Sequence, residues 1–460
     1  MRAVQTYRHN RHVITVVGAG FAGVEAAWAL ASRGTQVRLY EMRPHRQTPA
    51  HTTGHFAELV CSNSLKSKLP TSPAGLLKQE MAALGSIVLS TAAEHEVPGG
   101  EALCVDREKF GAALTSKLHM HPLIDVVDQP WTPDLLEGTT ILATGPLSTD
   151  EVSLWLAELT GRQHLHFYDA VSPTVDASTL DRSVVFAQSR YDKGGGDDYL
   201  NCPFEKDNYY AFVEALVNAE RVPVRAFEAG GKRDGDQTDE GAFLEKIKYF
   251  SGCTPIEAIA EKGARSLAFG NFKPIGLTDP RTGRRPYAAL QLRPENQEKT
   301  LYSLVACQNR LRFGEQKRVF QMVPGLENAE FVRYGVIHRN TYIDAPRVLS
   351  PNLSLVGHPN LFIAGQLTGV EGYVESAAMG ILAGLSALNP SLPVLPRASA
   401  LGALMGHLQD PTEREFAPMN VNWGLLPDPP EPMRDKGLKR AWKLEQAHAA
   451  FTEWRAAGAL

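Results

Sequence analysis

Hydrophobic and polar residues follow a strand–helix–strand pattern near the start of the chain. The run Val13-Ile-Thr-Val-Val17 is rich in β-branched residues and predicts a buried strand. An alanine-rich stretch that ends at Leu30 predicts a helix, and Thr35 to Glu41 predicts a second strand that ends in an acid. The opening segment therefore predicts a strand–helix–strand unit of the α/β class.

The turn between the first strand and the helix reads Gly18-Ala19-Gly20-Phe21-Ala22-Gly23. In this pattern Gly18 permits a tight turn, Gly20 lets the backbone approach a pyrophosphate, and Gly23 lets the helix pack close to the strand. Phosphates bind at such a helix N-terminus, and Glu41 is placed to accept hydrogen bonds from ribose hydroxyls. These residues predict a binding site for an adenine dinucleotide.

Two later segments repeat the pattern of a short apolar run followed by glycine. Residues 139–144 form a short apolar run that closes on Gly145. Residues 360–364 form another, and a glycine-rich loop and a helix of small residues follow it. In flavoproteins such elements approach the dinucleotide and the flavin ring, so we interpret the bound dinucleotide as FAD rather than NAD; an ordinary strand–turn–helix is the alternative. The candidate residues of the second loop are Gly365, Gly369, Gly372 and Tyr373.

The pattern changes in the middle third of the chain. Residues 286–293 and 301–307 predict strands, and residues 191–204 predict a loop that enters a strand. We interpret residues 166–333 as an α+β domain inserted into a Rossmann-like FAD-binding domain. The FAD-binding domain comprises residues 1–165 and 334–460 and ends in a helical tail. We also expect residues 50–110 to be irregular, with short helical pieces such as Gly75 to Leu84.

Composition narrows the class of protein. The chain has 460 residues, of which 43% are hydrophobic and 21% charged, as in ordinary soluble proteins of about two domains. No apolar run is long enough to cross a bilayer, and the start of the chain does not read as a signal sequence. We therefore expect a cytoplasmic protein that does not enter a membrane.

Charge gives no general attraction to nucleic acid, because the net charge is −4. Basic residues nevertheless gather in three places, which are either a polyanion-binding face or ordinary solvated surface. The three basic clusters are Arg281 with Arg284 and Arg285, Arg310 to Arg318, and Arg434 to Lys443.

The five cysteines are scattered, which does not suggest a disulfide scaffold or a zinc site, so we expect no metal. Cys61 and Cys253 both read as positions just before a helix, where the helix N-terminus favours the nucleophilic thiolate. Buried packing is the alternative for either thiol, and a long-range pair between them stays open. Cys104, Cys202 and Cys307 lie in strand-like contexts and are expected to be structural.

Read together, these segments closely resemble the folate- and FAD-dependent tRNA (uracil-5-)-methyltransferase family (TrmFO). The resemblance runs nearly from end to end and combines many short motifs, of which only the first glycine motif is shared widely with other flavoproteins. The other motifs occupy residues 39–44, 56–67, 102–107, 199–203, 252–257, 284–288, 334–341, 365–373 and 418–426.

The resemblance implies transfer of a one-carbon unit from 5,10-methylenetetrahydrofolate to C5 of uridine 54 in the tRNA T loop. FAD would act as methylene carrier and reductant, with NAD(P)H as the electron source and no obligate protein partner. Cys253 would be the nucleophile and Cys61 a second functional thiol. The acidic, glycine-rich stretch 228–241 looks longer than the family pattern, and it is either a surface loop or a segment that folds over the site and alters how substrate approaches.

Three alternatives remain at this point. A related flavoprotein modifies the wobble uridine of tRNA together with a partner GTPase, but we would expect a longer helical C-terminal part. A small-molecule FAD oxidoreductase with cycling thiols would need neither tRNA nor folate. A non-catalytic FAD-binding protein would leave the two thiols unexplained.

Overall fold

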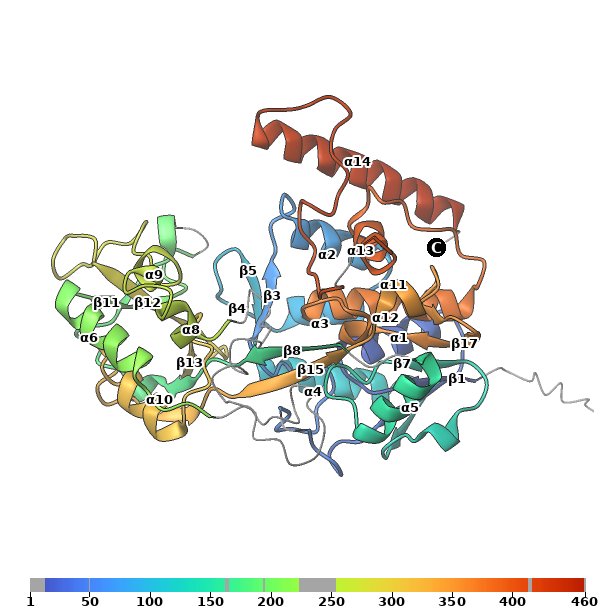
Figure 1. Ribbon diagram of the computed structural model, residues 1–460, viewed down its shortest axis with the longest axis horizontal. Helices are drawn as coiled ribbons and strands as arrows, with labels where there is room; N and C mark the ends of the chain where they lie inside the picture. Colours follow the sequence, from blue (N-terminus) through green and yellow to red (C-terminus); the bar gives the residue numbers. More distant parts are fainter. Residues whose placement is uncertain are drawn as a thin grey trace, which may run out of the picture.

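A six-stranded, mostly parallel sheet forms the centre of the larger body (Figure 1). The computed structural model describes residues 13–48, 50–161, 165–192, 195–222, 254–412 and 416–458. The strand order is β16-β17-β7-β1-β2-β6, and only β16 runs antiparallel to its neighbour. These strands are β1 (Ile14–Val17), β2 (Val37–Glu41), β6 (Ile124–Asp128), β7 (Thr140–Leu142), β16 (Ser354–Leu355) and β17 (His358–Ile363).

Two helices of small residues pack closely against each other beside this sheet. They are α1 (Phe21–Ala31) and α12 (Tyr373–Leu388), and nearly all of their residues are buried. A Cβ atom on Gly380 would lie 2.1 Å from the carbonyl oxygen of Ala22, so the two backbones come as near as glycine permits. The alanine-rich stretch read from the sequence therefore forms a helix that is buried on every side.

Residues 50–110 contain more regular structure than the sequence pattern predicts. The predicted helical piece from Gly75 to Leu84 is confirmed as α2 (Pro73–Ala83), and the segment also forms α3 (Ile87–Glu94) and a small sheet of order β3-β5-β4. The side chains of Ser72 and Ser86 accept backbone N–H groups and start the two helices. The strands are β3 (Ser64–Ser67), β4 (Glu96–Val97) and β5 (Ala102–Val105), and α4 (Arg107–His119) follows them. Elements this short carry little periodicity, which explains the error.

A second six-stranded sheet, of order β10-β11-β12-β13-β9-β14, forms the smaller body at the left of Figure 1. Its pairings are antiparallel, and its hydrophobic core is separate from that of the first sheet. The strands are β9 (Thr174–Asp176), β10 (Phe186–Ala187), β11 (Leu200–Phe204), β12 (Ala288–Pro294), β13 (Leu301–Leu304) and β14 (Phe331–Arg333). The helices are α6 (Lys206–Val217), α8 (Ile256–Ala260), α9 (Ser266–Phe269) and α10 (Phe313–Phe320).

A two-stranded ribbon joins the two bodies. It pairs β8 (Leu165–Ala170) with β15 (Ile337–Tyr342) in antiparallel register, so that Leu165 is opposite Tyr342 and Ala170 is opposite Ile337. Every strand of the second sheet lies between β8 and β15 in the sequence. The α/β, Rossmann-like fold class is thus confirmed, with an α+β part between two segments of the first body.

The remaining helices complete the larger body. They are α5 (Asp150–Thr160), α11 (Ala345–Val348), α13 (Ala400–Leu408) and α14 (Lys436–Ala457), and α14 lies along the top in Figure 1. The Trp454 indole donates a 2.7 Å hydrogen bond to the carbonyl oxygen of Pro393 and ties α14 to the body. Within the ranges given above, no helix has the length and apolar character that a membrane span requires.

Candidate active site

Three backbone segments meet at the glycine turn between β1 and α1. Gly18 adopts a φ of +92°, and a Cβ atom there would lie 2.7 Å from the carbonyl oxygen of Ala143. A Cβ on Gly23 would lie only 1.7 Å from the carbonyl oxygen of Gly18. Both positions therefore require glycine, for the turn and for close packing of α1. Gly20 is different, because its Cβ would meet nothing within 4 Å.

The acid at the end of β2 is held by its own chain. The Glu41 carboxylate accepts hydrogen bonds from the Ala19 N–H at 2.7 Å and from the Arg43 N–H at 3.0 Å. The Arg43 guanidinium adds bonds of 2.9 and 3.1 Å. Burial opposes ionisation, but these donors keep the pKa of Glu41 below its ordinary value. A ribose hydroxyl at this carboxylate would share or displace one of the four donors.

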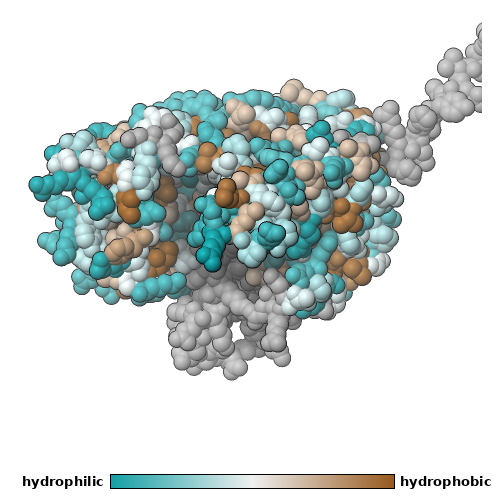
Figure 2. Space-filling view, turned by 90° about the horizontal axis from the view of Figure 1, so that it is seen from above, coloured by the Kyte–Doolittle hydropathy of each residue, from teal (hydrophilic) through white to brown (hydrophobic). Residues whose placement is uncertain are grey.

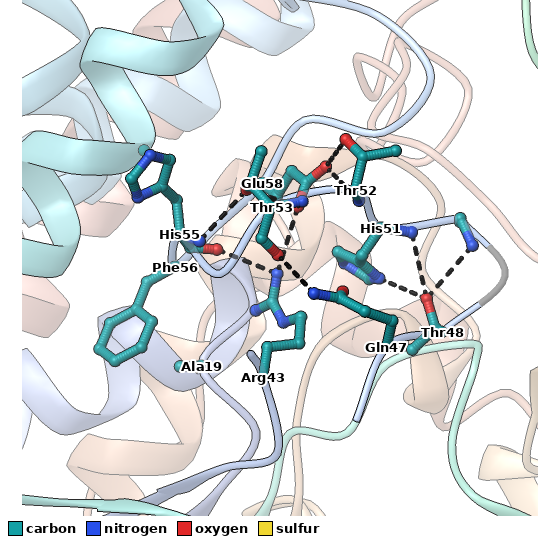
Figure 3. A network of polar contacts seen from close by, with 12 residues as sticks. Ala19, Arg43, Gln47, Thr48, His51, Thr52, Thr53, His55, Phe56 and Glu58 are labelled. Atoms are coloured by element: carbon teal, nitrogen blue, oxygen red, sulfur yellow. Dashed lines mark hydrogen bonds and ion pairs between the residues drawn. The ribbon is translucent and has the colours of Figure 1, made fainter. Parts of the chain in front are cut away.

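The loop after β2 folds back over the same region (Figure 3). The Arg43 guanidinium donates a 2.9 Å hydrogen bond to the carbonyl oxygen of His55 and lies 3.6 Å from the Glu58 carboxylate. Glu58 in turn accepts from the backbone N–H and the hydroxyl of both Thr52 and Thr53, at 2.8 to 3.1 Å. Arg43 therefore links the glycine turn to residues 52–58, which lead to Cys61.

These segments line a cavity of about 380 Å³. The structure brings most of the predicted site residues to it: Gly18, Gly20, Phe21, Ala22, Glu41, Cys61, Gly145, Gly365, Gly372 and Tyr373. Ala19, Gly23 and Gly369 are not among the lining residues. Ala19 and Gly23 belong to the same turn but are buried, and a Cβ on Gly369 would meet the ring of Phe416.

The cavity fits an extended dinucleotide. Gly20 and Gly145 both line it, and a Cβ on either would point into open space rather than into protein. The N-termini of α1 and α12 both begin at the cavity, so their free N–H groups are available to an anion. The ring of Tyr373, the first residue of α12, stacks on Phe21 with centroids 4.7 Å apart. This arrangement suits phosphates at the helix ends and a flat ring near Tyr373.

Cys61 lies at the Tyr373 end of the cavity. The Tyr373 hydroxyl accepts a 2.8 Å hydrogen bond from the Cys61 N–H, and its oxygen lies 3.0 Å from Cys61 Sγ. Burial, together with the nearby Cys61, raises the pKa of Tyr373 well above its ordinary value, so the phenol stays protonated. The expected helix after Cys61 is wrong, because the chain enters β3 instead. Cys61 therefore lies against the Tyr373 hydroxyl rather than at a helix N-terminus.

The second predicted thiol, Cys253, lies outside the described residues, as does the stretch 228–241. The described chain resumes at Thr254, and α8 begins at Ile256 after the cap residue Pro255. The Ile256 N–H donates a 2.7 Å hydrogen bond to the carbonyl oxygen of Gln308, which ties the start of α8 to the second sheet's body.

Three arginines, which the sequence analysis missed, hold the loop that carries Cys61. Arg107 donates to the carbonyl oxygen of Leu59 at 2.6 Å, and Arg333 donates to that of Val60 at 3.4 Å. Arg293 donates to the Ser62 hydroxyl at 2.7 Å. A buried ion pair joins Arg107 to Glu295. Burial lowers the pKa of Arg107, but the Glu295 carboxylate has the larger combined effect, so the pKa of Arg107 is raised overall. Two of these arginines come from the second sheet, so both bodies position Cys61.

A second missed pair lies beneath Gly372. Lys66 Nζ is 2.6 Å from the fully buried carboxylate of Glu375 and also donates to the carbonyl oxygen of Glu371 at 3.2 Å. A Cβ on Gly372 would meet both partners of this pair at 2.6 Å. Lys66 belongs to the motif 56–67 of the family resemblance, and Glu375 lies two residues after the motif 365–373, which is the signal that could have marked them.

The other three thiols are buried, as expected. Burial raises the pKa of Cys104, Cys202 and Cys307, so these side chains stay protonated. The four cysteines within the described ranges are free thiols. Those ranges also contain no group of three metal-binding side chains.

The three basic clusters differ in how many of their charges are already paired. Arg281 pairs with Asp279 at 2.8 Å, and Arg318 pairs with Glu315 at 2.7 Å. The ammonium of Lys443 is buried, and it donates to two carbonyl oxygens. Arg284 and Arg285, by contrast, are exposed.

Comparison with known proteins places the chain in a family. Residues 13–392 match the profile of the family described as glucose inhibited division protein A. The chain is 47% identical over 449 residues to the methylenetetrahydrofolate--tRNA-(uracil-5-)-methyltransferase TrmFO of Desulforamulus reducens, covering 97% of this chain and 98% of that one. It is 46% identical to the TrmFO of Bacillus subtilis, covering 93% and 95%.

A solved structure supports the fold. GidA of Aquifex aeolicus superposes with a TM-score of 0.64 at 14% identity, covering 96% of this chain and 73% of that one. The family profile covers the first segment of the larger body, everything up to the second segment, and the second segment as far as residue 392. The chain belongs to the family described as glucose inhibited division protein A and, with these relatives, to the TrmFO family.

Proposed function

We propose that this protein methylates C5 of a tRNA uridine with the one-carbon unit of methylenetetrahydrofolate and uses FAD. The cavity that joins the glycine turn, the start of α12 and the Cys61–Tyr373 pair carries this proposal. The relatives named above bear the same activity in their names. When bound, FAD would carry the one-carbon unit and supply the electrons that reduce this unit to a methyl group. We further propose uridine 54 of the T loop as the target and NAD(P)H as the electron source.

The binding residues follow from the cavity. Gly18, Gly20 and the N-terminus of α1 would hold the pyrophosphate, and Glu41 the adenosine ribose. Gly145 and the loop from Gly365 to Gly372 would lie along the rest of the dinucleotide, beside Phe21, Ala22 and Tyr373. We propose residues 1–165 and 334–460 as the FAD-binding domain and residues 166–333 as the substrate-side domain. Ala19, Gly23 and Gly369 would act by shaping the backbone.

A thiol suits the chemistry because C5 of uracil is a weak carbon nucleophile. Addition of the Cys253 thiolate to C6 would place enolate character on C5, which could then bond to the one-carbon unit. Removal of the C5 proton would let the thiolate leave C6. Cys61, held against Tyr373, would act in proton transfer or protect the intermediate. We place this reaction in the cytoplasm.

The test is nucleoside mass spectrometry on unmodified tRNA incubated with purified protein, methylenetetrahydrofolate and NAD(P)H. We expect 5-methyluridine in the T loop, lost when folate is omitted and not restored by S-adenosylmethionine. Cys253→Ala should abolish the product, and Cys61→Ala should reduce it strongly. Cys104→Ala, which removes a buried thiol of β5, is the matched control and should retain activity. Folded, FAD-loaded protein that makes no 5-methyluridine would overturn the proposal.

A further inference from the structure

Three large aromatic side chains are exposed in the described part of the second sheet's body, and one of them, Phe313, is 56% exposed and stacks on Tyr334. Tyr191 is 63% exposed and Phe269, at the end of α9, is 69% exposed. Most other phenylalanines there, such as Phe204 and Phe272, are fully buried. The Arg265 guanidinium lies over the Phe269 ring, 4.6 Å from its centroid. Seen from above, hydrophobic residues stand singly among hydrophilic ones on this lobe (Figure 2). Arg265 and Phe269 therefore present a positive charge and an aromatic ring side by side at the surface.

Tyr191 is held outward by a demanding backbone conformation. Its φ is +57°, which is rare for a bulky residue. The Tyr191 N–H donates a 3.1 Å hydrogen bond to the carbonyl oxygen of Gly276, and a Cβ on Gly276 would lie 3.1 Å from the tyrosine ring. The surrounding chain therefore fixes an exposed aromatic residue in place, a feature more typical of functional surfaces than of structural ones.

Exposed positive charge lies on the same body. Arg284 and Arg285 belong to a turn closed by a 2.9 Å hydrogen bond from the Asp279 N–H to the Arg284 carbonyl oxygen. Both are exposed, and within the described ranges no carboxylate pairs with either guanidinium. Arg285 is two residues from Tyr287, whose pKa is raised by the hydrogen bond with Tyr210, while the charge of Arg265 opposes that rise. The same turn pairs Arg281 with Asp279, so two of its three arginines remain available to an anion.

A row of polar side chains connects this surface with the Cys61 loop. Arg190, next to Tyr191, donates a 2.8 Å hydrogen bond to the side chain of Gln291 on β12. Gln291 and Arg293 lie on the same face of β12, about 7 Å apart. Arg293 donates to Ser62, which neighbours Cys61. A ligand on the exposed rings would thus lie a few side chains from the cavity.

We propose that Tyr191, Arg265, Phe269, Arg284 and Arg285 form an aromatic–arginine face that binds an RNA loop, with unstacked bases on the rings and phosphates at Arg284 and Arg285. Single-stranded RNA offers both the π-faces and the regular negative charge that this combination recognises. A protein partner would instead call for a contiguous apolar patch. The choice of a tRNA loop as that RNA rests on the function proposed above.

The test measures binding of a fluorescent T-arm stem-loop to the FAD-loaded protein by anisotropy, over a series of salt concentrations. A blunt duplex of the stem alone is the competing probe. Phe269→Ala and Tyr191→Ala should each weaken stem-loop binding about fivefold to a hundredfold and leave the salt slope unchanged. Arg284→Gln and Arg285→Gln should weaken both probes and lower the salt slope by about one each.

Matched controls remove equal side chains elsewhere. Arg38→Gln removes an exposed arginine of β2, and Leu154→Ala removes an exposed apolar residue of α5. Neither should change binding. The proposed face is wrong if all four face variants bind the stem-loop with wild-type affinity and salt slope. It is also wrong if the variants change only the sedimentation coefficient, because such a change would indicate a contact between copies of the chain. Methylation of tRNA, measured in parallel, separates the two proposals. If the wild-type protein methylates tRNA but the face variants bind the stem-loop normally, only the proposed face is refuted.

Discussion

Alanine substitutions at Gly20 and Gly23 should separate cofactor binding from folding. A Cβ on Gly20 meets nothing in the structure, whereas a Cβ on Gly23 would lie 1.7 Å from the Gly18 carbonyl oxygen. Ordinary contact begins at 3.4 Å, so Gly23→Ala must push α1 and the turn apart by about 1.7 Å. Backbone cannot yield as a flexible side chain does, and overpacking of this kind costs ~1–3 kcal/mol.

Gly20→Ala should leave the apoprotein nearly as stable as the wild type. Alanine is the poorer residue at this helix cap, by up to ~1 kcal/mol. It also restricts the unfolded chain, which stabilises by about 0.4–1 kcal/mol, so the two effects nearly cancel. The new methyl group would nevertheless occupy the space through which the pyrophosphate approaches. We expect FAD affinity to fall at least about tenfold, which corresponds to ~1.4 kcal/mol.

The assays are urea unfolding of the two apoproteins followed by circular dichroism, and FAD titration followed by flavin fluorescence. Gly23→Ala gains up to ~1 kcal/mol of helix propensity. Subtracted from the upper end of the overpacking cost, this leaves an expected net loss of ~2 kcal/mol, with weaker FAD binding as a consequence. If Gly20→Ala binds FAD as tightly as the wild type, the pyrophosphate does not lie where we place it. If Gly23→Ala unfolds no earlier than Gly20→Ala, the steric reasoning is wrong.

Other predictions concern single contacts. Tyr373→Phe leaves the Cys61 N–H without its acceptor and should lower the free energy of unfolding by ~1–2 kcal/mol; an unchanged urea midpoint would contradict this. Because the pKa of Glu41 is lowered on folding, its carboxylate stabilises the protein above about pH 4.5, the unfolded value, and this contribution is lost as pH falls through the folded pKa. The difference in urea midpoint between wild type and Glu41→Gln should thus be larger at pH 7 than at pH 3, and equal differences would refute it. Gly380→Ala should destabilise by ~1–3 kcal/mol because its Cβ meets the Ala22 carbonyl oxygen. Gly314→Ala on α10, where nothing lies within 4 Å, serves as its control and should be neutral or stabilising in the same unfolding assay.

The nucleotide-binding elements could be predicted because their signals are local. The β-branched runs, the glycine turn and the acid at the end of β2 lie within 30 residues of one another, and the structure shows a steric or electrostatic reason for each. The same holds for the strand before Gly365 and the helix that begins at Tyr373.

Contacts between distant segments could not be predicted from the sequence. Arg293 and Ser62 are 231 residues apart, and Arg333 and Val60 are 273 apart, so no spacing in the sequence marks them as partners. Cys61 illustrates the same limit. Ser and Asn after it resemble a helix cap, but pairing of Ser64 with Cys104 on β5 makes the following residues a strand. Tertiary pairing outweighed the local preference.

The ribbon of β8 and β15 has an evolutionary consequence. Since Leu165 and Tyr342 are direct partners, the chain leaves the first body and returns to it at points separated by one strand spacing, about 5 Å. A segment whose two ends are this close can be lengthened, exchanged or lost without stretching the fold that hosts it. The cofactor-binding body could thus have been kept while the material beyond the ribbon changed to suit a new substrate. The contacts of Arg293 and Arg333 with the Cys61 loop would then be the part that each such exchange has to rebuild.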